Sequence, residues 1–200
     1  MTKKEEWLAG TRSAVPIMLG YVPVGIAYGV MARQAGLNTR QTVLMSLTVY
    51  GGASEMMAAG MVAQGAAVLT IVLTTFILNL RHIIMSTCVF NQMQGGRLPV
   101  RMLAAFGVTD ETFAVYTTTA NAPRTPRYFF SMALCSYLSW ALGSWLGAIA
   151  TGLLPPLITA ALGISLYAMF IGLLMPGLHG NGRLAALVVL TALCNTVLCN

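Results

Sequence analysis

The chain has 200 residues, of which 57% are hydrophobic and only 8% are charged, and its formal net charge is +6. Soluble domains carry about 25% charged residues, so this composition excludes an ordinary soluble domain. The apolar runs are continuous rather than alternating, which argues against a β-barrel. We therefore expect an all-α integral membrane protein in which residues 1–200 form a single transmembrane domain.

The basic residues lie between apolar runs, which is the pattern of the positive-inside rule rather than that of a nucleic-acid-binding surface. The cysteines are isolated within apolar runs, and none belongs to a Cys-x-x-Cys motif. They are typical of small hydrophobic residues rather than of disulfides or metal ligands; they are Cys88, Cys135, Cys194 and Cys199. We expect no nucleic-acid partner, cofactor, metal or catalytic residue.

The first apolar segment, Ser13–Arg33, is interrupted by Pro16 and Pro23 and by several glycines. A proline inside a helix removes a backbone hydrogen bond. Such a sequence is consistent with a broken or re-entrant helix, and equally with a kinked spanning helix whose small residues form a packing face.

The second segment, Thr42–Gln64, contains Gly51, Gly52, Ser54 and Glu55 in its middle. A glycine pair at membrane depth permits local unwinding, which exposes backbone groups to a ligand. We predict a break near Gly51–Ser54. The N–H groups there are candidates for binding a carboxylate, and Glu55 is a candidate for binding an ammonium group or a proton.

The third segment, Leu69–Val89, carries Asn79, Arg81 and His82 near its middle. A cation at the bilayer centre costs about 2.5–3.5 kcal/mol on insertion scales, so these residues indicate a functional site. Helical spacing places Asn79 and His82 on one face with Thr75, and turns Arg81 well away. The alternative is that Arg81 snorkels and that His82 is a structural hydrogen-bonding residue.

Glu55 is the one acid inside an uninterrupted apolar run, which makes it the natural partner of Arg81 or His82. We predict that Glu55 and Arg81 approach each other, or share a cavity, near the bilayer midplane. The alternative is a structural pair without a role in transport. An unperturbed histidine titrates near pH 6.5, so His82 is a second candidate for carrying a proton.

The stretch Leu103–Thr119 contains Asp110 and Glu111, so it is a poor lipid-facing span. We expect either an amphipathic or re-entrant helix, or a buried span whose acids line a cavity. In that cavity the acids would gate a pathway or relay protons. Equally, the two acids fit the first turn of a helix, where the helix dipole favours them. Further segments are expected at Tyr128–Thr151, at Leu157–Pro176 and from Leu184 onward, giving about six to seven membrane segments in all.

A weak internal repeat suggests that segments one to three recur as segments four to six. At one fixed offset Gly51, Met57, Gly60 and Gly65 match Gly163, Met169, Gly172 and Gly177, and after a short insertion Val72, Thr75 and Asn79 match Val188, Thr191 and Asn195. Repeated halves with interrupted helices are typical of transporters. The second copy lacks counterparts of Glu55 and Arg81, so the polar site is expected to be asymmetric.

The basic loops set an expected topology. If the loops that contain Arg33 and Arg40, Arg97 to Arg127, and Arg183 are all cytoplasmic, the uncharged turns at Gln64–Gly65 and Pro155–Pro156 lie outside. That arrangement requires residues 103–119 not to span and makes the two halves inverted. It also places the N-terminus outside unless the first segment is re-entrant.

Four stretches in this order and spacing resemble the AzlC family: GYVPVGIAYG, YGGASEMM, LNLRHIIM and TDETFA. The resemblance covers nearly the whole chain. It implies the large subunit of a bacterial branched-chain amino-acid exporter in the inner membrane, a small AzlD-type membrane partner, and coupling to protons. The implied substrates are valine, leucine and isoleucine, with methionine as a further candidate. Family members often have Gln where this chain has Glu55, and they usually continue beyond the equivalent of Asn200.

The sequence leaves two rival functions. One is an accessory or scaffold subunit with a structural Glu–Arg pair, and the other is an intramembrane hydrolase that uses Ser54 and His82. No recognised nucleophile motif surrounds either of these two residues. No Walker A motif is present either, so an ATP-driven permease would need a partner ATPase.

Overall fold

The computed structural model describes residues 2–153 and 182–198 and six single positions between them, which are 155, 157, 161, 164, 171 and 175. Throughout this described part the secondary structure is helical without a strand, which confirms the all-α prediction. The chain falls into two units, residues 1–166 and 167–200. The second unit contains α10 (Gly182–Leu198), which begins two residues before the start expected at Leu184. Whether the whole chain acts as a single domain stays a prediction.

Three helices of the described part are long and apolar enough to cross a membrane: α1 (Lys3–Gln34), the pair α4–α5 (Val68–Gln92) and α8 (Pro126–Ala150). The full count of six to seven segments stays a prediction. Most of the fifth expected segment, at residues 157–176, lies outside the described residues. So do Pro156, residues 179–181 and four residues of the second repeat copy, which are Gly163, Met169, Gly172 and Gly177, whereas the loop predicted at 179–183 is already helical from Gly182.

α1 is one continuous helix, although it contains Pro16 and Pro23. It begins ten residues before the expected start because Thr2 caps it: the Thr2 side chain and that of Glu5 form a capping box. The interpretation of the first segment as a broken helix is therefore wrong; the continuous helix is long and apolar enough to span, and that it spans stays a prediction.

α1 and α8 run parallel and pack through small residues. Gly10 lies beside Ser131, whereas Gly29 lies beside Ala148, so residue numbers rise together along both helices. A Cβ atom added to Gly29 would come 2.6 Å from the Ala148 nitrogen, and one added to Gly143 would come 2.7 Å from the Val22 carbonyl oxygen. Glycine at these positions lets the two backbones approach as they do at many helix crossings in membranes.

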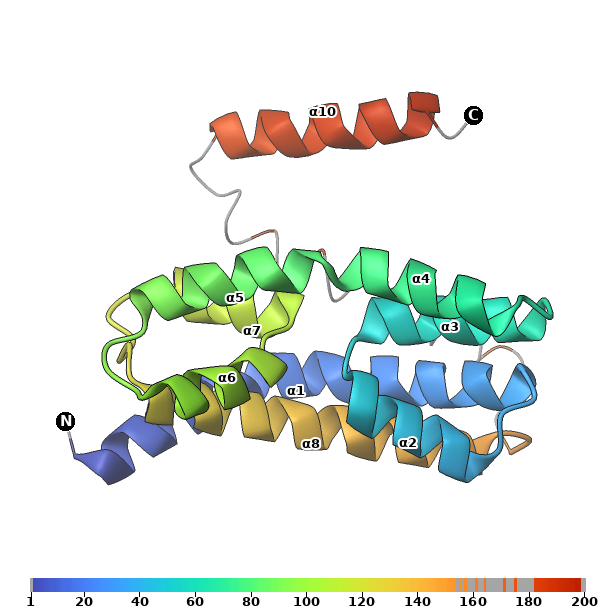
Figure 1. Ribbon diagram of the computed structural model, residues 1–200, viewed down its shortest axis with the longest axis horizontal. Coiled ribbons are helices and arrows are strands. Elements are labelled where there is room, and N and C mark those ends of the chain that lie inside the picture. The colour runs from blue at the N-terminus through green and yellow to red at the C-terminus, as the bar shows by residue number, and fades with distance from the viewer. Residues whose placement is uncertain are drawn as a thin grey trace. The chain divides into compact units, whose positions relative to one another are not determined.

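The second segment is a re-entrant helical hairpin. α2 (Thr39–Val49) runs inward alongside α8, the chain turns at Tyr50 and Gly51, and α3 (Gly52–Ala63) returns to the end from which α2 started (Figure 1). Tyr50 is left-handed (φ 46°, ψ 51°) and Gly51 is extended. The predicted break near Gly51–Ser54 is confirmed. It begins at Tyr50, one residue before the predicted start.

The stretch Leu103–Thr119 takes part in a second hairpin, which enters from the opposite end. α6 (Leu98–Phe106) starts near Pro126, since Gly96 faces that proline, and ends where the Phe106 ring contacts Tyr137. α7 (Asp110–Thr118) then returns and brings Tyr116 beside Tyr128. The re-entrant interpretation of this stretch is confirmed, and so is the placement of Asp110 and Glu111 in the first turn of a helix.

α4 (Val68–Asn79) and α5 (Arg81–Gln92) form one spanning rod with a tight turn at Leu80. The Leu80 N–H bonds to the Ile77 carbonyl and the Ile83 N–H bonds to the Leu80 carbonyl, three residues back in each case. Apolar side chains of this rod are exposed, including Val72, Phe76 and Ile84. Such a face suits contact with lipid.

The two hairpins correct the expected topology. The first segment is one continuous helix, and the second segment enters and leaves at the same end. Toward the N-terminal end of the first unit lie the residues Lys3, Lys4, Arg12, Arg97, Arg101, Arg124 and Arg127, whereas Arg33 and Arg40 lie toward the other end. The expectation that these loops share one side is therefore wrong, and so is an inverted relation between α1 and α8. With these positions, the positive-inside rule predicts that the N-terminal end faces the cytoplasm.

This topology is testable by thiol labelling. In a variant without native cysteines, single cysteines at Gly36 and Gly65 should react with a membrane-impermeant maleimide from one side, and cysteines at Gln94 and Asn121 from the other. The two hairpins require this grouping, because each one returns to its own side. If Gly36 and Gly65 were labelled from opposite sides, the second segment would span and the hairpin would be refuted.

Candidate functional site

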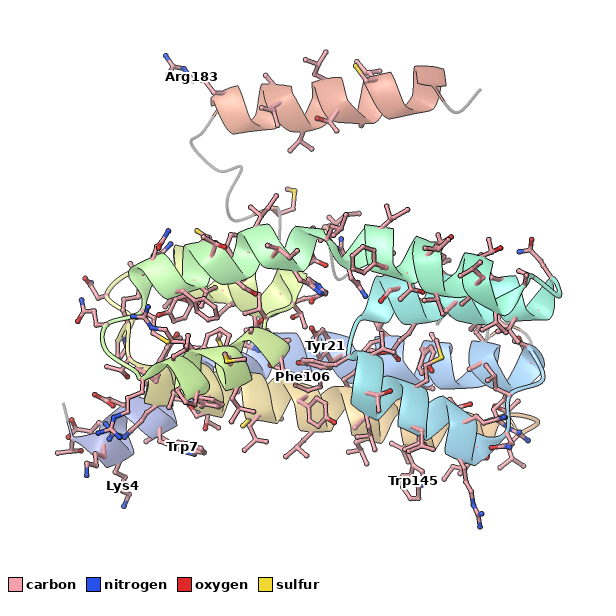
Figure 2. All side chains as sticks on the ribbon, in the orientation of Figure 1. Lys4, Trp7, Tyr21, Phe106, Trp145 and Arg183 are labelled. Carbon is pink, nitrogen blue, oxygen red and sulfur yellow. The ribbon has the colours of Figure 1, made fainter. Side chains whose placement is uncertain are left out.

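The tips of the two hairpins meet in the middle of the first unit, beside the midpoints of α1 and α8. The rings of Tyr50 and Phe106 lie 5.8 Å apart, measured between centroids. α3 and α7 both begin here, and a helix N-terminus carries a partial positive charge. We call the buried residues around these tips the tip cluster; they are Tyr21, Tyr50, Glu55, Glu111 and Trp140 (Tyr21 is labelled in Figure 2).

Glu55 is fully buried and is held by neutral hydrogen-bond donors. The Gly51 N–H donates to Glu55 Oε1 at 2.9 Å, and the Trp140 indole N–H lies 3.3 Å from the same oxygen. Among the described residues Glu55 makes no ion pair. The predicted close approach of Glu55 and Arg81 as a pair is therefore wrong, because backbone and indole donors surround the carboxylate instead. A cavity shared by the two residues stays a prediction.

Glu111 is the second buried acid, on the tip of the other hairpin. The Tyr21 hydroxyl donates to Glu111 Oε2 at 2.7 Å and lies 2.8 Å from Thr109 Oγ1, the cap of α7. The Tyr21 ring also packs edge-on against Trp140, at 5.4 Å between centroids. Tyr21 and Trp140 therefore connect the two buried acids through one pair of aromatic side chains.

Arg81 pairs with Asp110, not with Glu55. Arg81 Nη2 lies 2.8 Å from Asp110 Oδ2, and the two side chains are 39% and 27% exposed. This pair joins the start of α5 to the start of α7. The long Arg81 side chain thus reaches the tip of the second hairpin from just beyond the turn at Leu80.

The remaining predicted residues lie around the first hairpin tip. Ser54 Oγ donates to the Gly51 carbonyl at 2.8 Å, and a Cβ atom on Gly52 would lie 2.9 Å from the Trp140 ring. Asn79 Oδ1 is buried without a hydrogen-bond partner in the described part, 3.7 Å from the Cβ position of Gly51. The Ser54 hydroxyl thus bonds to its own helical turn, which gives no support to a hydrolytic Ser54–His82 pair.

His82 is partly buried, and the charged side chains that act on it are Asp110 and Arg81. It thus lies near the Arg81–Asp110 pair. Cys88, Cys135 and Cys194 are free.

Sequence reasoning missed Tyr21, Tyr50 and Trp140 as site residues. Tyr50 had one signal, since it stands directly before the glycine pair. Trp140 lies in an apolar run without charges or glycine pairs, so its contact with Glu55 depends on how α8 packs against the first hairpin. That packing is a tertiary property, and no local pattern reports it.

The sequence profile described as AzlC protein matches residues 16–154, which include both hairpins and the whole tip cluster. The chain belongs to the AzlC family. Three of its described helices are long and apolar enough to cross a membrane, and two of its relatives are named as membrane proteins. No solved structure matches the chain.

Three relatives show how far the AzlC likeness extends. An uncharacterized membrane protein of Archaeoglobus fulgidus is 33% identical over 188 residues, covering 93% of this chain and 82% of the relative. The inner membrane protein YgaZ of Escherichia coli is 30% identical over 179 residues, covering 84% and 72%. The branched-chain amino acid transport protein AzlC of Bacillus subtilis is 27% identical over 157 residues, covering 74% and 61%.

The Arg81–Asp110 pair predicts the outcome of a charge exchange. Asp110→Asn should lower the free energy of unfolding by about 1–2 kcal/mol, because it leaves a partly buried cation without its partner. The exchange Arg81→Asp with Asp110→Arg should recover more than half of that loss. Thermal unfolding in detergent measures both.

The matched control is the ion pair of Arg127 and Glu6, whose Nη1 and Oε2 atoms lie 3.6 Å apart at the N-terminal end. Removing this pair with Glu6→Gln should change stability by less than about 1 kcal/mol. Equal losses at both pairs, or no recovery on exchange, would contradict the assigned role of Asp110.

Proposed function

We propose that this chain is the large subunit of a secondary transporter that exports hydrophobic neutral amino acids across the bacterial inner membrane. The proposed substrates are valine, leucine and isoleucine, with methionine as a further candidate. The observation that carries the proposal is the meeting of two half-helix tips beside two buried acids in mid-membrane. Interrupted helices that present their N-termini at the midplane are a recurring form of transporter binding site. A relative named for branched-chain amino acid transport supports the substrate class.

The site has the groups that a zwitterion needs. A carboxylate is stabilised at a helix N-terminus, and α3 and α7 both begin at the tips. The Gly51 N–H is already bonded to Glu55, so the Glu55 side chain occupies the position that an incoming carboxylate would take. We propose that substrate displaces Glu55 from this N–H and that the freed acid then binds the ammonium group. Arg81 is the alternative partner for the carboxylate.

Proton coupling through Glu55 or His82 is the second part of the proposal. Export against a gradient needs a source of energy, and the sequence has no Walker A motif. An ionised carboxylate without a cation is costly to bury, and no cation pairs with Glu55 in the described part of the chain. A proton on Glu55 removes that cost. Protonation therefore shifts the equilibrium between the inward-open and outward-open states of the site.

We further propose a small AzlD-type membrane subunit as the partner. The competing proposal is that this chain is itself an accessory or scaffold subunit. The buried acids favour the transporter, because a scaffold gains nothing from two carboxylates that lack cations. Mutation of Glu55 separates the two: a scaffold loses assembly, whereas a transporter assembles and loses flux.

Everted membrane vesicles that contain the chain and its partner test the function directly. With an imposed pH gradient, labelled leucine should accumulate against its own gradient. Glu55→Gln should reduce that accumulation at least about tenfold, since a single lost proton step is worth a factor of ten or more in rate. The control Glu6→Gln, an acid far from the tips, should change it less than about twofold.

Two results would contradict the proposal. One is that leucine never accumulates against its gradient. The other is that Glu55→Gln and His82→Ala both leave pH-driven accumulation unchanged, which would remove these residues from proton coupling.

A further inference from the structure

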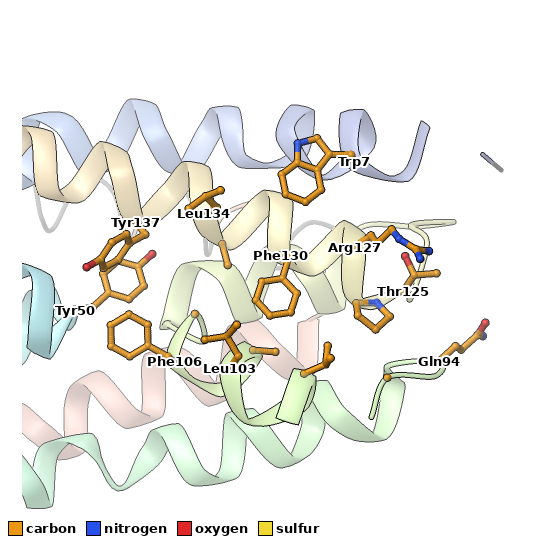
Figure 3. Close-up of a pocket in the computed structure, with 16 residues that line it drawn as sticks. Trp7, Tyr50, Gln94, Leu103, Phe106, Thr125, Arg127, Phe130, Leu134 and Tyr137 are labelled. Carbon is orange, nitrogen blue, oxygen red and sulfur yellow. The ribbon is translucent and has the colours of Figure 1, made fainter. Parts of the chain in front are cut away.

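A cavity of about 900 Å³ lies between α6 and α8 and leads to the hairpin tips. Its outer end, toward the N-terminal end of the unit, includes Gln94, Thr125 and Arg127, and its inner end includes Tyr50, Phe106 and Tyr137 (Figure 3). Apolar side chains line the path between the two ends, among them Leu103, Phe130 and Leu134. A mostly apolar cavity with a few polar groups at its ends is the usual form of a small-molecule site.

Tyr50 closes the inner end of this cavity in an unusual state. It is a bulky residue in the left-handed region (φ 46°), where side chains other than glycine are strained. Its side chain is buried, and its hydroxyl makes no hydrogen bond of standard length in the described part, although the neighbouring Tyr21 side chain lies close enough for a longer one. Buried hydroxyls almost always have partners. Strain and an unpaired polar group at one residue indicate a functional position.

The rings around Tyr50 form a barrier between the cavity and the acids. Tyr137 packs edge-on against Tyr50 at 4.9 Å between centroids, and Phe106 lies 5.7 Å from Tyr137. On the other side Tyr50 faces Tyr21, the residue that holds Glu111. A ligand in the cavity must therefore pass Tyr50 before it reaches either buried acid.

We propose that the inner end of this cavity binds the hydrophobic side chain of an amino acid, with the Tyr50 hydroxyl bound to its charged head and Phe106 and Tyr137 setting the accepted size. This inference rests on the proposed transport function and adds the place and the residues of substrate recognition. The cavity is larger than one leucine, so the ligand occupies the inner end. The outer part, which includes Gln94 and Thr125, is the route of approach.

Leucine binding to the chain in lipid nanodiscs, measured by calorimetry, tests the inference. Tyr50→Phe removes only the hydroxyl and should weaken leucine binding about tenfold, the usual effect of losing one hydrogen bond to a charged group. The matched control is Tyr116→Phe. Tyr116 is also buried with an unpaired hydroxyl, but it lies outside the cavity lining, so its loss should leave binding unchanged.

A second pair of variants tests the cavity itself. Leu134 and Leu142 are both about half exposed on α8, but only Leu134 lines the cavity. Leu134→Trp should weaken leucine binding at least about tenfold while alanine binding changes less, because the added ring fills space that the larger side chain needs. Leu142→Trp should affect neither ligand.

The outcomes separate the two proposals. If the unaltered chain binds leucine and neither Tyr50→Phe nor Leu134→Trp weakens it, the inference is wrong and the transport function stands. If the unaltered chain binds no amino acid, the inference is wrong, whereas the transport function is decided by the vesicle experiment with the partner present. Equal losses in Tyr50→Phe and Tyr116→Phe would also overturn the inference, since a general effect on folding would then explain both.

Discussion

The structure depends on satisfying backbone polar groups at membrane depth. Lipid offers no hydrogen-bond partners, so a chain can reverse inside a bilayer only where protein surrounds the reversal. Both hairpin tips meet this condition, because the parallel pair α1 and α8 lies beside them and carries Tyr21, Trp140 and Tyr137 to the level of the breaks. The glycines that bring α1 and α8 together therefore also determine where the two hairpins can end.

The same constraint explains the placement of polar side chains. The N–H groups at the start of α3 and α7 need hydrogen-bond acceptors, because no preceding helical turn supplies them. Each tip supplies its own acceptor: Glu55 accepts from the Gly51 N–H, and Thr109 caps α7. Both acceptors lie where the two hairpin tips meet. The proposed transport site at the tips is consistent with the way the breaks are stabilised, and its proposed substrate class rests on a relative named for branched-chain amino acid transport.

Local patterns predicted the broken elements well, because a glycine pair or adjacent acids in an apolar run conflict with a regular span whatever the neighbours are. They did not predict partners. Glu55 and Arg81 looked complementary in sequence, yet Asp110 reaches Arg81 and Trp140 reaches Glu55, since packing decides which helices are adjacent. The topology failed for a related reason: a hairpin and a bent span have the same sequence pattern, and only the contacts of α2 and α3 with α1 and α8 distinguish them.

The central claim is that the tips of two opposite hairpins touch. It is tested most directly by cross-linking cysteines placed at Tyr50 and Phe106, whose rings lie 5.8 Å apart, in a chain without native cysteines. A short bis-methanethiosulfonate reagent should join the two positions within one chain through disulfide links, and a reductant should release the link. A pair at Gly65 and Phe106 should not react, because Gly65 lies at the far end of its hairpin. Failure of the first pair to cross-link, or equal reaction of both pairs, would contradict the account.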